Sequence, residues 1–336
     1  MQKILIVKIS ALGDILHALP VLKALKQSHP DVFTGWLVAR AYKEILEGNP
    51  YLDKIFVFER ERWRGMKNCL FRQNEIWQLL KEIRSEGFDT CLDLQGLFRS
   101  GFFTFLSGAS RRLGFGNARE FSTLAYNERV DVPISIIHAV DRNAYLAERI
   151  VQQPVPRDFP VFLSEQDKQK ANFWLQGKPC IIMAPGTRWP SKRWPTNYFG
   201  KLIDDLLIAY NATIALVGAK GDAGLGEQIL SSTRFPEKVV NLIGKTSIKE
   251  LCAVMSKADL VISNDSGPMH IAAAMGAKVL ALFGPTDTQK TSPYGKNHIV
   301  LQHEYGCNPC RNRVCSKQPT CMEHLLPEEV KKHIVF

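Results

Sequence analysis

The sequence predicts an α/β protein in which two doubly wound parallel sheets follow each other along the chain. Short apolar, β-branched runs alternate with amphipathic helical segments in both halves. Between residues 151 and 162 this rhythm stops at Pro154, Pro156 and Pro160. A chain of 336 residues is long enough for two domains of ordinary size. We therefore expect domains at residues 1–155 and 156–336, with a cleft between them.

In the first half, the apolar runs are short and nearly continuous, as in strands that helices cover on both faces of a parallel sheet. The expected strands are 3–9, 33–39, 55–58 and 88–94. The expected helices are 14–27, 75–86 and 138–152, with another after Gly96.

The second half repeats the rhythm, although no internal sequence repeat is visible. The expected strands are 179–184, 213–217, 259–263 and 278–283. The expected helices are 196–210, 221–231 and 247–257, with one that begins near Pro268. Ligands of open parallel sheets bind outside the carboxyl ends of the strands, so chemistry is expected in the loops that follow them.

Composition restricts the class of protein. A hydrophobic content of 45% with 23% charged residues is typical of a soluble globular protein. No apolar run reaches the roughly 18 residues that cross a bilayer, and the first residues are too short an apolar run for a signal peptide, so we expect a cytoplasmic location. The net charge of +10 favours an anionic partner, which leaves nucleic acid, acidic lipid headgroups and phosphorylated sugars open.

The segment 261–276 is the strongest functional signal. An apolar strand runs into the turn Asn264-Asp265-Ser266-Gly267, and a helix then starts with Pro268 at its beginning. The unpaired amides and the dipole at such a helix start suit a diphosphate. Asp265 either caps this helix or binds a sugar hydroxyl, and His270 is expected to face the same pocket.

Two other loops follow expected first strands. In residues 184–195, Thr187 and Lys192 are suited to a phosphate; a structural loop that only starts the next helix is the alternative. In residues 10–14, Asp14 is placed to act as a general base or, alternatively, as a helix cap. Neither this loop nor the glycines near residue 221 have the spacing of a dinucleotide fingerprint, which argues against a nicotinamide-dependent oxidoreductase.

Basic residues gather in the first half. Arg60, Arg62 and Arg64 surround Trp63, and more arginines follow in later loops, among them Arg119. Arginine matches the geometry of phosphate and carboxylate, so the loop suits an anionic ligand, while a solvated charged loop is the alternative.

Four of the eight cysteines lie together near the end of the chain, at Cys307, Cys310, Cys315 and Cys321. Four thiolates at short spacing can form a closed structural zinc site. Disulfides and free thiols are the alternatives.

Four segments resemble the lipopolysaccharide heptosyltransferases of glycosyltransferase family 9: residues 8–17, 187–195, 265–270 and 283–287. The resemblance implies a GT-B fold of two Rossmann-like domains that face a cleft, and transfer of heptose with inversion from ADP-L-glycero-β-D-manno-heptose. It implies that Asp14 is the catalytic base and that no cofactor is required for catalysis. It also implies the following donor-binding residues: Thr187, Lys192, Asp222, Thr246, Asp265, Ser266, Gly267 and His270.

The same resemblance implies an acceptor side in the first domain, formed by Ser10, Gly13, Arg60, Arg62, Arg64 and Arg119. The basic loop, residues 117–120 and Tyr126-Asn127 look like the branch that adds the first heptose to Kdo, heptosyltransferase I. The cysteine cluster instead looks like relatives that add a second or later heptose. Implied partners are ADP-heptose, Kdo-lipid A or inner-core lipopolysaccharide, and the anionic inner leaflet, with the enzyme peripheral at the cytoplasmic face of the inner membrane.

A basic chain can also be a non-catalytic binder of nucleic acid or of a membrane surface. That class leaves the Asp14 and Asp265 turns unexplained, and we find no recognition-helix or RNA-stacking motif. We therefore expect no nucleic-acid partner.

Overall fold

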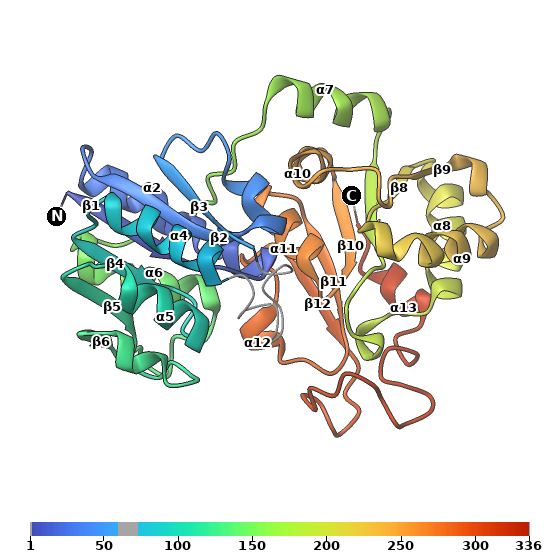
Figure 1. Cartoon of the computed structure of the whole chain (residues 1–336). Helices are drawn as coiled ribbons and strands as arrows, with labels where there is room; N and C mark the ends of the chain where they lie inside the picture. Colours follow the sequence, from blue (N-terminus) through green and yellow to red (C-terminus); the bar gives the residue numbers. More distant parts are fainter. Residues whose placement is uncertain (1, 60–72, 336) are drawn as a thin grey trace. The chain divides into compact units, whose positions relative to one another are not determined.

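The computed structural model describes residues 2–59 and 73–335, and the chain divides into two compact units, Met1–Phe162 and Leu163–Phe336 (Figure 1). The division falls at the end of the proline-containing segment 151–162, somewhat after the boundary at 155/156 that we expected. Each unit has its own sheet and its own core, as the fold-class prediction requires.

The sheet of unit 1 has six parallel strands in the order β3-β2-β1-β4-β5-β6. Their bounds are β1 Lys3–Val7, β2 Phe33–Ala39, β3 Lys54–Phe58, β4 Thr90–Asp93, β5 Arg111–Phe115 and β6 Glu128–Val130. The sequence did not predict β5 and β6, because β5 begins with two arginines and β6 is a short edge strand without an apolar run.

Helices and 3-10 turns connect these strands. They are α1 Leu12–Leu16, α2 Leu19–Ser28, η1 Arg40–Leu46, α4 Gln73–Ser85, α5 Phe98–Leu106, η2 Ser122–Ala125 and α6 Ala139–Val151. The single helix expected over 14–27 was wrong, because the chain breaks between α1 and α2. Pro20, near the start of α2, has no N–H for a helical bond to residue 16 and its ring clashes with that carbonyl.

The sheet of unit 2 also has six parallel strands, in the order β12-β11-β10-β7-β8-β9. Their bounds are β7 Cys180–Ala184, β8 Thr213–Leu216, β9 Val239–Asn241, β10 Leu260–Asn264, β11 Val279–Phe283 and β12 Ile299–Gln302. In both units the first strand is central, the second and third lie on one side of it, and the fourth to sixth lie on the other.

The helices and 3-10 turns of unit 2 complete the alternation. They are α7 Glu165–Trp174, η3 Pro190–Lys192, α8 Thr196–Tyr210, η4 Lys220–Asp222, α9 Ala223–Ser232, η5 Pro236–Lys238, α10 Ile248–Ser256, α11 Gly267–Ala274, α12 Thr288–Thr291 and α13 Pro327–Lys332. No helix among the described residues is both long and apolar enough to cross a bilayer.

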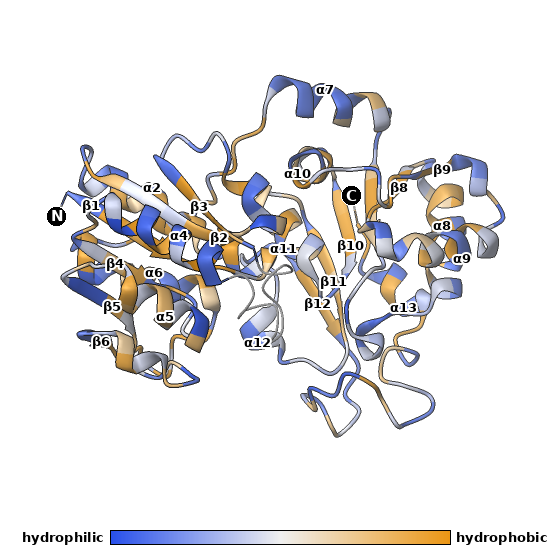
Figure 2. Ribbon diagram, viewed as in Figure 1, coloured by the Kyte–Doolittle hydropathy of each residue, from blue (hydrophilic) through white to orange (hydrophobic). Residues whose placement is uncertain are grey.

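Each core lies between its sheet and the helices that cover it, and Figure 2 shows the strands as the hydrophobic part of both units. In unit 1, Leu5, Val7 and Phe56 on the sheet pack in one cluster with Phe103 of α5. In unit 2, Ile181 and Leu282 share a cluster with Trp194 and Phe199. Burying such side chains supplies most of the stability of each unit, at roughly 25 cal/mol per Å² of apolar surface.

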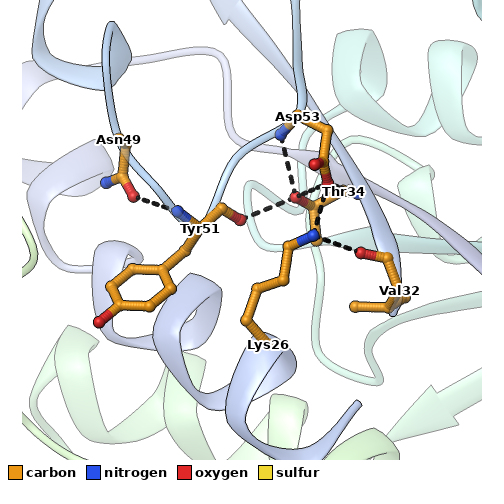
Figure 3. Close-up of polar contacts among 6 residues, drawn as sticks. All are labelled: Lys26, Val32, Thr34, Asn49, Tyr51 and Asp53. Carbon is orange, nitrogen blue, oxygen red and sulfur yellow. Dashed lines mark hydrogen bonds and ion pairs between the residues drawn. The ribbon is translucent and has the colours of Figure 1, made fainter. Parts of the chain in front are cut away.

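A polar network closes the amino edge of the unit 1 sheet (Figure 3). Asp53 accepts a 2.7 Å hydrogen bond from the Thr34 amide and a 2.8 Å bond from the Lys26 ammonium. The Thr34 hydroxyl donates to the carbonyl oxygen of Tyr51, and Lys26 also donates to that of Val32. These groups bond to one another at the edge opposite the carboxyl ends of the strands, which fits a structural role.

Candidate functional site

Both sheets have a point where the strand order reverses, beside the first strand of the unit. In unit 1 it lies between β1 and β4, and in unit 2 between β7 and β10. In open α/β sheets, loops diverge at such points and ligands bind outside the carboxyl ends of the strands. The loops predicted to be functional follow β1, β7 and β10 and therefore lie at these two points.

In unit 2, three loops meet at the carboxylate of Asp265. The Lys192 ammonium lies 2.6 Å from Asp265 Oδ2, and the Thr286 hydroxyl donates to the same oxygen at 2.6 Å. Asp265 is buried and Lys192 is largely buried. These residues follow β10, β7 and β11, so the bonds fix the loops relative to one another. Sequence reasoning did not single out Thr286 as a site residue, because it is one polar residue at the end of a strand.

The start of α11 lies directly beside this group. Its N-cap is Ser266, in extended conformation, followed by Gly267 and Pro268. No side chain caps the helix and its first turn has no acidic residue, so Asp265 bonds Lys192 and Thr286 instead of capping. The Ser266 hydroxyl is buried and has no hydrogen-bond partner within the described part of the chain. The amides at this helix start are therefore available to an anion, and His270 lies half-buried within the same helix.

The loop that bears Lys192 is anchored on both sides. Asn264 donates to the carbonyl oxygen of Pro185 at 2.8 Å, and its own side-chain oxygen accepts from the Trp194 amide. The buried indole of Trp194 donates to the Leu325 carbonyl at 2.7 Å. The Arg193 guanidinium donates to the backbone carbonyl of Thr187. These bonds reduce the freedom of Lys192 before any ligand binds.

Trp189 adds an aromatic face to this loop. The Lys192 ammonium lies 4.7 Å from the centre of its ring, and the Arg313 guanidinium lies 5.6 Å from it. Arg313 belongs to the cysteine-rich segment. Ser191, in the loop of Trp189, bonds to this segment: its amide donates to the Arg313 carbonyl and its hydroxyl donates to the Asn312 carbonyl. Sequence reasoning missed Arg313, because no local pattern links it to a loop so distant in the sequence.

Asp222 and Thr246 also lie at the carboxyl edge of this sheet. Asp222 accepts from the Ala219 amide at 2.9 Å, and a Cβ added at Gly186 would lie 2.3 Å from its carboxylate. Asp222 is therefore pressed against the turn that follows β7, where no side chain larger than glycine fits. Thr246 is half-buried between β9 and α10. The structure thus collects every predicted donor-binding residue along one edge of one sheet.

In unit 1, Asp14 lies in the first turn of α1, just after β1. Its Oδ2 accepts from the Ala11 amide at 2.9 Å, as a helix cap does. Oδ1 makes no hydrogen bond to any described residue, and the side chain is half-buried. The Ser10 amide donates to the Gln95 side chain, which ties this loop to the segment after β4, and Gly13 is buried. The Asp14 carboxylate therefore caps the helix with one oxygen and has a second oxygen that can accept a proton.

Lys8 and Asp93 are buried ionisable groups at the same edge of the sheet as Asp14. The Lys8 ammonium donates to the Leu94 carbonyl at 2.5 Å; burial lowers the pKa of Lys8, and the charges of Asp14 and Asp93 oppose that shift. Burial raises the pKa of Asp93, against the hydrogen bonds from the Gly96 amide and the Tyr126 hydroxyl. Lys8 thus lies close enough to Asp14 for their charges to interact, although sequence analysis quoted Lys8 only as part of a motif.

The predicted acceptor side is described only in part, because Arg60, Arg62 and Arg64 lie outside the described residues. Arg119 is exposed, and its amide donates to the Gly96 carbonyl at the switch point. Tyr126, which we expected on the acceptor side, is buried with its hydroxyl 2.7 Å from Asp93. Asn127 bonds the Arg112 amide and the Ser110 carbonyl. These two residues have structural roles, because protein groups already satisfy their polar atoms.

The sequence model of the family described as "Glycosyltransferase family 9 (heptosyltransferase)" matches residues 76–321 of this chain. The chain belongs to glycosyltransferase family 9. The lipooligosaccharide heptosyltransferase 2 of Campylobacter jejuni is 38% identical over 95% of this chain and 93% of its own length. The lipopolysaccharide heptosyltransferase 1 of Pseudomonas aeruginosa is 25% identical over 95% of this chain and 89% of its own length.

Solved structures confirm the GT-B fold expected of a family 9 glycosyltransferase. A heptosyltransferase of Escherichia coli, solved with ADP, superposes with a TM-score of 0.79 at 24% identity and covers 98% of each chain. A family 9 glycosyltransferase of Veillonella parvula superposes with a TM-score of 0.83 at 22% identity and covers 98% of this chain and 95% of its own.

The cysteine-rich segment of this family 9 chain does not support the zinc prediction. Burial, together with the nearby thiols of Cys315, Cys310 and Cys307, raises the pKa of Cys321 to about 11. All four are free thiols. Across residues 2–59 and 73–335, no three His, Cys, Asp or Glu side chains are arranged to hold a metal ion. Hydrogen bonds to the loop after β11 hold the segment instead. The Asn308 side chain donates to the Gly284 carbonyl, and the Arg311 amide donates to the Pro285 carbonyl.

Proposed function

We propose that this family 9 glycosyltransferase moves heptose from ADP-L-glycero-β-D-manno-heptose to the inner core of lipopolysaccharide, with inversion at the anomeric carbon. The observation that supports this most is the group of Lys192, Asp265 and Thr286 beside the uncapped start of α11. A cation and a helix start without a side-chain cap, at one switch point, suit the diphosphate of a nucleotide sugar. The names of the relatives supply the sugar and the acceptor class.

Unit 2 is proposed to hold the donor. Negative charge grows on the diphosphate as its bond to the anomeric carbon breaks. Lys192 and the first amides of α11 stabilise that charge, so ADP can leave without a metal ion or other cofactor. Asp265 orients Lys192 and retains a second oxygen that can accept from a sugar hydroxyl. Thr187, Asp222, Thr246, Ser266, Gly267 and His270 complete the proposed donor side.

Asp14 is proposed to be the general base. The oxygen of the acceptor hydroxyl attacks the anomeric carbon as its proton moves to Asp14, and the bond to the diphosphate breaks on the opposite face of the sugar. Ser10 and Gly13, in the same loop, are proposed to contact the acceptor.

We propose that the acceptor is the Kdo of Kdo-lipid A, which makes the protein a heptosyltransferase I. Kdo and the lipid A phosphates are anionic, and Arg119 is an exposed cation near the switch point of unit 1. Arg60, Arg62 and Arg64 are proposed to add to it. The second candidate acceptor is a core that already bears heptose, which the 38% identity to a heptosyltransferase 2 favours. Either acceptor is membrane-embedded, so we propose a peripheral position at the cytoplasmic face of the inner membrane.

Transfer from ADP-heptose to purified Kdo2-lipid A, read by mass spectrometry, tests this proposal. A gain of one heptose supports the first acceptor. No gain on Kdo2-lipid A, together with a gain on a heptosylated core, supports the second. Failure on both acceptors would refute the proposed function.

A further inference from the structure

The helix α5 exposes a line of phenylalanines. Phe98, Phe102 and Phe105 lie on one face at positions i, i+4 and i+7, with exposed fractions of 63%, 37% and 58%. The opposite face holds the buried Phe103 and Thr104, which pack toward the core. The exposed line is therefore not the core-facing side of this helix.

The neighbouring turn η2 extends the line into a surface. Phe121 is 82% exposed and Leu124 is 73% exposed. A Cβ added at Gly101 of α5 would lie 3.0 Å from the Cβ of Ser122, so α5 and η2 pack closely together. We call Phe98, Phe102, Phe105, Phe121 and Leu124 the α5–η2 surface.

Contacts join α5 and η2 at both ends of this surface. At one end, the Phe98 amide donates to the Glu120 carboxylate, next to Phe121. At the other, the Arg112 guanidinium lies 5.7 Å from the ring centre of Phe105 and donates to the carbonyl oxygen of Ala125, next to Leu124. Exposed apolar side chains gathered on two adjacent elements are typical of an interaction site.

The charges around the patch indicate what binds it. Arg119 is exposed and Arg112 lies over Phe105, whereas the carboxylate of Glu120, beside Phe121, already accepts from the Phe98 amide. Aromatic rings flanked by arginines suit the boundary of a bilayer, where rings enter the interface and guanidinium groups meet lipid phosphates. A second copy placed on this patch by two-fold symmetry would bring the same arginines together, which is unfavourable.

We propose that the α5–η2 surface docks on the headgroup region of an anionic membrane. The proposal deepens the proposed function, because a lipid-linked acceptor is reached from that surface. Docking confines the enzyme to the plane that contains its acceptor. It therefore raises the rate of encounter with a membrane-bound acceptor and has no effect on a water-soluble one.

Co-flotation of the full chain with vesicles tests the docking itself. The probe is a vesicle of phosphatidylethanolamine and phosphatidylglycerol, with phosphatidylcholine vesicles as the neutral comparison. Wild type should float with the anionic vesicles and be released by salt. The variant F105S/L124S should bind them about tenfold or more weakly, since two apolar side chains leave the interface. The control F173S removes a phenylalanine that is 75% exposed on α7 of unit 2, and it should bind like wild type.

A transfer assay separates this proposal from the proposed function. F105S/L124S should lose kcat/KM with acceptor in vesicles and keep wild-type kcat/KM with a deacylated, water-soluble acceptor. An unchanged far-ultraviolet spectrum and thermal midpoint would show that the variant folds. If wild type transfers no heptose, the proposed function fails while flotation still decides the docking. The docking proposal would be overturned if F105S/L124S floated with the anionic vesicles as wild type does. It would also be overturned if wild type formed a dimer that this variant lost while still binding the vesicles.

Discussion

At the residue scale, the Asp14 carboxylate has two roles: it caps α1, and we propose that it removes a proton from the acceptor. Asp14→Asn separates them, because the amide keeps an oxygen for the Ala11 N–H but is not basic. We expect turnover to fall roughly 10²-fold or more, with ADP affinity and thermal stability close to wild type. Transfer kinetics and calorimetric titration with ADP measure both. Turnover at the wild-type rate would exclude Asp14 as the base.

Lys192 is the proposed contact of the donor diphosphate. Its replacement by alanine removes the cation and also leaves Asp265 buried without its 2.6 Å partner. We expect ADP to bind about 10- to 100-fold more weakly, as for the loss of a hydrogen bond to a charged group. Lys201→Ala is the matched control, because Lys201 forms an exposed ion pair with Glu328. Equal ADP affinity in the two variants would argue against the phosphate role.

At the element scale, the network of Figure 3 links α2, β2 and the segment before β3. Burial alone would raise the pKa of Asp53, but hydrogen bonds from Lys26 and Thr34 outweigh it and hold that pKa below its usual value. A lowered pKa in the folded state means that ionised Asp53 stabilises the fold above about pH 4, and that this contribution is lost as pH falls through the folded-state pKa.

Asp53→Asn should therefore destabilise the protein at pH 7 by about 1 kcal/mol, and the difference from wild type should shrink as the pH falls toward the acid range. Urea unfolding across that range measures this difference. Asp31→Asn is the control, since Asp31 is exposed. A difference between wild type and Asp53→Asn that stays constant with pH would contradict this account.

Elements with a strong apolar pattern were predicted well from the sequence. The bounds of β2 and α8 agree with prediction to the residue. The short strands β9 and β12 were missed, as β5 and β6 were, because so few apolar residues give no clear period. Asp14, Lys192 and Asp265 were placed correctly at strand ends, because parallel strands bring their carboxyl ends to one edge. The contact of Arg313 with Trp189 was not predictable, since only the folded chain brings these residues together.

At the scale of the whole molecule, the two units share one strand order without a visible sequence repeat. What the halves have in common is therefore the path of the chain, and each path has one switch point. The Asp14 carboxylate and the buried Lys8 lie at the switch point of unit 1, and Lys192 lies beside a helix start at that of unit 2. The chemistry differs between the units although the architecture does not.

The cysteine-rich segment is bonded to the loops that follow β7 and β11. We therefore expect the reactivity of its thiols to change when a ligand binds at those loops. Cys307, Cys310 and Cys315 are half-buried, so local opening of their segment exposes them further to alkylation. A ligand that binds only the unopened segment suppresses that opening, by up to about 100-fold when its concentration is about 100 times Kd. ADP should therefore slow maleimide labelling of these thiols, followed by mass spectrometry, while labelling of the core residue Cys252 stays negligible with or without ADP. The protein's own thiols would then report ADP binding without an added fluorophore or a transfer reaction.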